Sequence, residues 1–70
     1  MKMPTTAARE AILSHCVTRS ASAPYAFNAA AMASEIGFPY WLVWYSLQRL
    51  VFAGEIKKSD HIYTYTRRES

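Results

Sequence analysis

His15 and Cys16 are neighbours whose types could support chemistry, because a histidine beside a cysteine can hold a metal ion or form a nucleophile. On a helix, however, successive side chains point about 100° apart, so these two do not converge on one site. We expect Cys16 in the core and His15 on the surface. No pair of carboxylates, glycine-rich phosphate loop or Ser/His/Asp grouping has the spacing of an active site. The sequence therefore predicts a protein that is not an enzyme and uses no metal or cofactor.

Cysteine usage and hydropathy bear on where the protein works. Cys16 is the only cysteine, which rules out an internal disulfide or a CxxC metal knuckle. The longest apolar run, residues 36–45, is interrupted by Pro39 and is shorter than the about 20 residues of a membrane span. Residues 1–6 lack the apolar core of a signal peptide. We expect a cytoplasmic protein with no membrane partner.

The positive charge of the chain is concentrated near its C-terminal end. The formal net charge is +3. The charged residues from position 57 onward are mostly basic, namely Lys57, Lys58, Arg67 and Arg68 against Asp60 and Glu69. Such an excess favours a polyanionic partner. An alternative for Lys57 and Lys58 is that they form the solvated edge of a hairpin and guard it against aggregation.

The first half of the chain is predicted to form two helices. Seventy residues are enough for one domain and too few for two. Apolar residues of a first helix, over about residues 6–19, recur at the spacing of one buried face, at Ala8, Ile12, Leu13, Cys16 and Val17. After a loop, residues 25–27 alternate as a short strand would. Asn28 is a typical N-cap for a second helix over about residues 29–36, which Gly37 ends by taking a positive φ.

The residue pattern in the second half of the chain predicts a third helix and a hairpin. Pro39 suits the start of a helix that runs over about residues 40–53. Beyond it, a wing over about residues 55–66 contains two strands on either side of Ser59 and Asp60. This pair is not a favoured two-residue turn, so a four-residue loop is an equal alternative. In a tight pairing, Ile56, Tyr63 and Tyr65 share one face.

The run Ala33-Ser-Glu-Ile-Gly-Phe-Pro39 resembles the winged helix-turn-helix family. The resemblance continues through the apolar stripe of Val43, Leu47 and Leu50 into Ala53-Gly-Glu-Ile56, and it covers roughly residues 28–66. In this pattern, Ala33 is small because two helices cross there, while Ile36 and Phe38 plug the core on either side of the turn. The fold implied is mainly α with a small β-hairpin, with three helices plus a two- or three-stranded wing.

The resemblance implies sequence-specific binding to double-stranded DNA by a small bacterial, phage or plasmid transcriptional regulator. In that family the third helix enters the major groove and the wing touches the neighbouring backbone. The residues that would face the groove are Tyr40, Trp41, Trp44, Tyr45 and Gln48. The residues that would meet phosphates from the wing are Lys57, Lys58 and His61, and the Asn28 end of the second helix offers a further anion site. Pairing on repeated half-sites, as a homodimer or cooperatively, is also implied.

The third helix departs from the family pattern because residues 37–48 include no charged side chain. Base reading would then be largely apolar, with Gln48 for adenine and aromatic rings for thymine methyl groups. Trp41, Tyr45, Gln48 and Phe52 are expected opposite the apolar stripe, exposed to solvent. The alternative function is therefore a protein adaptor or homodimer that docks through this aromatic face. For Tyr40 and Trp44, on the flank of the stripe, a place in the core and contact with DNA are both open.

Overall fold

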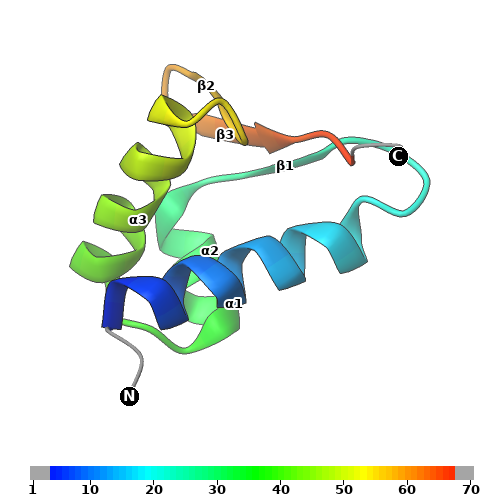
Figure 1. The fold of residues 1–70 in the computed structure, drawn as a ribbon. Helices are drawn as coiled ribbons and strands as arrows, with labels where there is room; N and C mark the ends of the chain where they lie inside the picture. The colour runs from blue at the N-terminus through cyan, green and yellow to red at the C-terminus, as the bar shows by residue number, and fades with distance from the viewer. Residues whose placement is uncertain (1–3, 68–70) are drawn as a thin grey trace.

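The computed structural model of the protein describes residues 4–67, which leaves Arg68 and Glu69 outside the described residues. This part of the chain contains three helices and a three-stranded antiparallel sheet, the arrangement of a winged helix (Figure 1). The elements in chain order are α1 (Pro4–Arg19), β1 (Tyr25–Phe27), α2 (Ala29–Ile36), α3 (Tyr40–Phe52), β2 (Lys57–Ser59) and β3 (Ile62–Tyr65). The fold is thus mainly helical with a small hairpin, as the sequence predicts.

Helix α2 begins and ends as its flanking residues predict. The Asn28 side-chain oxygen accepts a hydrogen bond of 2.7 Å from the Ala31 amide, which satisfies one of the free donors of the first turn. At the other end, Gly37 has a φ of 74° and its amide donates to the Ala33 carbonyl. These two caps limit α2 to eight residues and place the start of α3 immediately after the turn.

Replacing Gly37 by valine is expected to lower the free energy of unfolding by about 1–2 kcal/mol, the cost of a left-handed conformation for a residue with a Cβ. A Cβ at this position would meet no atom within 4 Å, so the cost comes from the backbone and not from a clash. Gly37→Asn should cost less, because asparagine visits this region more readily. Urea denaturation measures both variants, and equal losses would contradict the conformational explanation.

The core lies where the inner faces of the three helices meet the sheet. Its fully buried residues include Ile12 and Cys16 of α1 and Val43 and Leu47 of α3. Ile36 and Phe38 pack against this core in a partly buried state, as expected for the two sides of the turn. Burial raises the pKa of the Cys16 thiol to about 12, so the thiol stays protonated and inert at neutral pH.

The hairpin turns one residue later than the sequence suggested. Ser59 is the last residue of β2 and pairs with Ile62 in β3, so the two-residue loop is Asp60 and His61 instead of Ser59 and Asp60. Asp60 has a φ of 61°, a conformation that aspartate tolerates better than most residues. The third strand, β1, pairs with the other edge of β3, in the sheet order β1-β3-β2.

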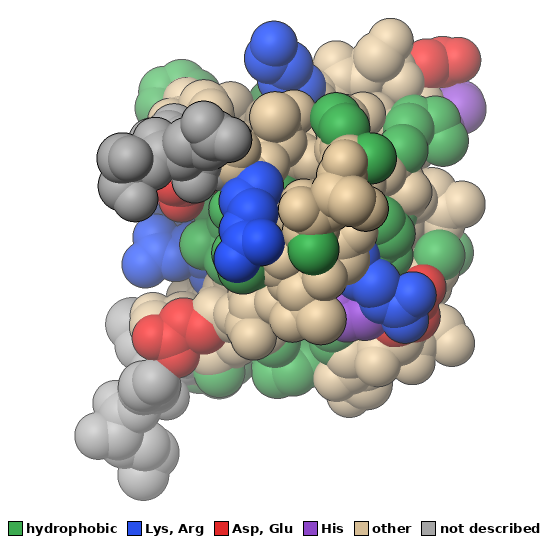
Figure 2. All heavy atoms as spheres, turned by 90° about the vertical axis from the view of Figure 1, so that its right-hand side faces the viewer, with side chains coloured by type: hydrophobic (Ala, Val, Ile, Leu, Met, Phe, Trp, Pro, Cys, Tyr) green, Lys and Arg blue, Asp and Glu red, His purple; other side chains and the backbone are tan. Residues whose placement is uncertain are grey.

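A charged cluster joins α1 to α2 on the side of the molecule turned away from α3, at the lower right of Figure 2. His15 Nε2 lies 2.6 Å from Glu35 Oε1, and Arg19 lies 3.5 Å from the same oxygen. Burial, followed by the nearby Glu35 carboxylate, raises the pKa of Tyr25. His15 thus lies at the surface, as expected, although this contact leaves only 18% of its side chain exposed.

Candidate nucleic-acid interface

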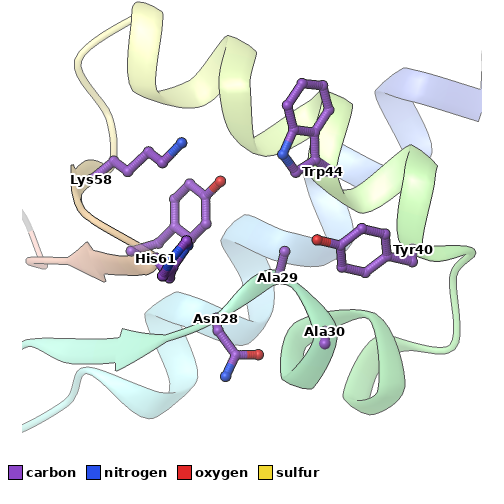
Figure 3. A pocket seen from close by; sticks show the side chains of 8 residues that line it. Asn28, Ala29, Ala30, Tyr40, Trp44, Lys58 and His61 are labelled. Carbon is purple, nitrogen blue, oxygen red and sulfur yellow. The ribbon is translucent and has the colours of Figure 1, made fainter.

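A cleft of about 310 Å³ opens where the start of α2, the first half of α3 and the tip of the wing converge (Figure 3). Its lining residues are Asn28, Ala29, Ala30, Tyr40, Trp44, Lys58, His61 and Tyr63. Five of these residues were expected from the sequence to contact DNA, namely Asn28, Tyr40, Trp44, Lys58 and His61. The hairpin and the helix-turn-helix thus bring together groups that are up to 33 positions apart in the chain, from Asn28 to His61.

Lys58 projects from the wing across the cleft toward α3 (Figure 3). It stands opposite Tyr63 in the β2–β3 pairing, so both side chains lie on the same face of the hairpin. The Lys58 ammonium is 5.6 Å from the centre of the Tyr63 ring, a favourable cation–π arrangement. Tyr63 is buried and therefore a rigid support, which holds the positive charge of Lys58 over the cleft.

Gln48 links the third helix to the wing instead of facing solvent. Its side-chain amide nitrogen donates a 2.7 Å hydrogen bond to the Tyr63 hydroxyl, and the residue is partly buried. The expectation that Gln48 is exposed beside Trp41 and Tyr45 is therefore wrong. A tyrosine hydroxyl beside the core needs a polar partner, and Gln48 is the residue of α3 that reaches it.

The start of α2 forms the floor of the cleft on the side away from Lys58. Ala29 and Ala30 belong to the first helical turn, whose amide groups have no acceptor within the helix. Asn28 caps the Ala31 amide and contributes no charge, so it does not offset the positive end of the helix dipole beside the cleft. The small alanine side chains leave this end open to an anion.

Aromatic side chains of α3 form the opposite wall. Tyr40 and Trp44 are one turn apart, with 55% and 46% of their surfaces exposed, so both belong to the surface and not to the core. The Tyr40 hydroxyl points into the cleft (Figure 3). The wall therefore combines a flat apolar surface with one hydroxyl donor.

The other residues that the sequence predicted to contact DNA lie outside this cleft. Lys57 precedes Lys58 on β2, so its side chain points to the opposite face of the hairpin, toward a shallow hollow shared with Thr64 and Arg67. Trp41 and Tyr45 are exposed farther round α3, where Tyr45 accepts a 3.4 Å hydrogen bond from Arg49. Tyr63 was not nominated, although its place opposite Lys58 follows once the register of the hairpin is known.

An aromatic stripe, defined here as Trp41, Tyr45 and Phe52, covers the outermost side of α3. Trp41 is 66% exposed and Phe52 is 95% exposed, which agrees with the helical spacing that set them opposite Val43 and Leu47. Helix α3 also buries Leu42 and Ser46, so its inner face is broader than the stripe of Val43, Leu47 and Leu50. The wide inner face fixes the orientation of the helix about its own axis.

Across residues 4–67, no three His, Cys, Asp or Glu side chains gather closely enough to hold a metal ion. None of the helices in this part of the chain has the length and apolar character needed to cross a membrane. No protein-family model matches the chain, and no curated protein sequence or solved structure is significantly similar to it.

Proposed function

We propose that this chain is a winged helix-turn-helix protein that binds double-stranded DNA, with α3 in the major groove and the wing on the adjacent backbone, and that it acts as a sequence-specific transcriptional regulator. The observation that carries the proposal is the cleft in which Lys58 and His61, the open start of α2, and Tyr40 and Trp44 face one space. A lysine ammonium, a helix N-terminus and exposed aromatic rings on one face are the chemistry that phosphates and base edges require.

The dimensions of the elements favour duplex DNA over other polyanions. A helix with its side chains is about 10–12 Å across, which fits a major groove about 12 Å wide. Helix α3 lies at one edge of the molecule (Figure 1), and its outermost aromatic residues, Trp41 and Phe52, are exposed. With α3 seated in the groove, Lys58 and the start of α2 would meet the same backbone strand.

Base reading in this proposal is mainly apolar. Trp44 and Tyr40 would contact thymine methyl groups, and the Tyr40 hydroxyl would bind a base edge or a phosphate. Gln48 retains its carbonyl oxygen for an adenine amino group, while its amide nitrogen is engaged by Tyr63. Sequence preference should therefore favour A·T pairs.

Alanine substitutions of two neighbouring lysines test whether the cleft binds DNA. Lys58→Ala should weaken binding to all duplex sequences alike and reduce the slope of log K against log salt concentration by about 1. Lys57→Ala removes the same charge from the opposite face of the same strand, so it should change the slope much less. Fluorescence anisotropy of labelled duplexes at several salt concentrations measures both. If the wild type showed no affinity for any duplex at low salt, the proposed function would be wrong.

A second candidate function rests on the aromatic stripe, because exposed aromatic residues on a small protein commonly mark a protein interface. In this candidate the stripe docks a partner protein or a second copy of the chain. Light scattering of the wild type and of Trp41→Ala tests it: a dimer formed through the stripe would lose mass on substitution, whereas a constant monomer mass would argue against self-association.

A further inference from the structure

A second cleft, of about 300 Å³, lies on the other flank of α3, between this helix and the start of α1. Its lining residues are Thr5, Thr6, Arg9, Tyr45, Ser46 and Arg49. Figure 1 shows the start of α1, in blue, beside α3. Two guanidinium groups and several hydroxyl groups thus face one cleft. The cleft between α3 and the wing, by comparison, is lined by one lysine.

The positive charge of the two arginines in this cleft is only partly offset by the acidic residues described near them. None of the ion pairs within residues 4–67 involves Arg9 or Arg49, whereas Arg19 is paired with Glu35. Arg49 instead donates to the Tyr45 hydroxyl, and its guanidinium lies 5.9 Å from the centre of that ring. Glu55 lines an adjoining hollow together with both arginines, which leaves a net charge of +1 across that group. The arrangement leaves guanidinium donors available to an outside anion.

Hydroxyl groups at the base of this cleft are a second, independent indication of a polar ligand. Ser46 lines the cleft from the buried face of α3, and its hydroxyl oxygen has no hydrogen-bond partner among the described residues. Such a group is costly in an apolar interior. Thr5 and Thr6 lie in the first turn of α1, where backbone amides also lack acceptors within the helix.

We propose that this second cleft, lined by Arg9 and Arg49, binds a backbone phosphate of DNA on the strand that borders α3 opposite the wing. The inference rests on the proposed function. Tyr45 follows Trp44 directly, so it is turned about 100° around α3 from the wall of the first cleft. A helix in the major groove has a phosphate backbone on each side. Lys58 holds one backbone and the two arginines hold the other, which compensates for the absence of charge along residues 37–48.

Salt-dependent binding of the full chain to a labelled duplex tests the proposal. Arg9→Gln and Arg49→Gln should each weaken binding about tenfold, as expected for loss of a charged hydrogen bond, and each should reduce the salt slope by about 1. Arg19→Gln is the matched control, because Arg19 lies on α1 but pairs with Glu35 away from α3, and it should leave both quantities unchanged.

Two outcomes would overturn the proposal and leave the proposed function intact. In the first, both arginine variants bind DNA with the wild-type slope while Lys58→Ala loses affinity. In the second, inorganic phosphate titrated without DNA saturates the cleft, as followed by the amide resonances of Thr5 and Thr6, yet the variants bind DNA normally. The cleft would then serve free phosphate. If the wild type binds no duplex at all, the proposed function itself fails.

Discussion

Leu47→Ala is expected to lower the free energy of unfolding by about 2–5 kcal/mol, the usual cost of replacing a buried leucine by alanine. Leu47 has no exposed surface and belongs to the inner face of α3, which packs on the rest of the core. A domain of this size has a total stability of roughly 4–10 kcal/mol, so the variant should lose a large fraction of it. Circular dichroism during urea or thermal denaturation measures the effect.

Phe52→Ala is the control for this loss, since it removes a large apolar side chain from the same helix at a position that is 95% exposed. Its effect on stability should stay within about 0.5 kcal/mol, as for most surface substitutions. Comparable losses for the two variants would mean that α3 is not oriented as described. The assignment of the cleft beside Trp44 to DNA would then have no basis.

Trp44→Ala is expected to reduce affinity for a preferred duplex by about 30-fold or more, which corresponds to a binding hot spot of at least about 2 kcal/mol. Trp44 forms a wall of the cleft between α3 and the wing, where an indole ring contributes a large contact area without losing many side-chain rotamers. Because more than half of its surface is buried in the free protein, circular dichroism must first establish that the variant is folded. Selection of bound duplexes from a random pool supplies the preferred sequence.

Trp41→Ala provides the contrast to Trp44→Ala. Trp41 belongs to the aromatic stripe, so its truncation tests self-association through that stripe, whereas Trp44→Ala tests the cleft. Measured together, the two variants separate the functions of α3. Loss of DNA binding in Trp44→Ala, with the wild-type mass retained in both variants, supports direct contact with DNA. Unchanged affinity in Trp44→Ala would contradict the role given to the cleft.

The helices and their limits were predictable because they depend on neighbours in sequence. Asn28 as a cap and Gly37 as a left-handed stop act within a few residues, and the helical spacing of Val43 and Leu47 determines which side of α3 turns inward. The start of α1 is Pro4, two residues before the predicted position, and α3 ends at Phe52. Such end effects depend on single hydrogen bonds, which hydrophobic spacing does not report.

The three helices, the basic wing and the outward aromatic side of α3 follow from the order of residues along the chain, because composition and period specify which groups must be buried. Which polar groups share a site depends instead on how the folded elements pack together. The register of the hairpin places Lys58 in the cleft and Lys57 on the opposite face. The packing of the wing on α3 lets Gln48 donate a hydrogen bond to the Tyr63 hydroxyl. The packing of α1 on α3 likewise brought Arg9 to Arg49. Contacts between distant segments depend on how whole elements pack, and a one-residue shift in pairing reverses the face that each side chain occupies.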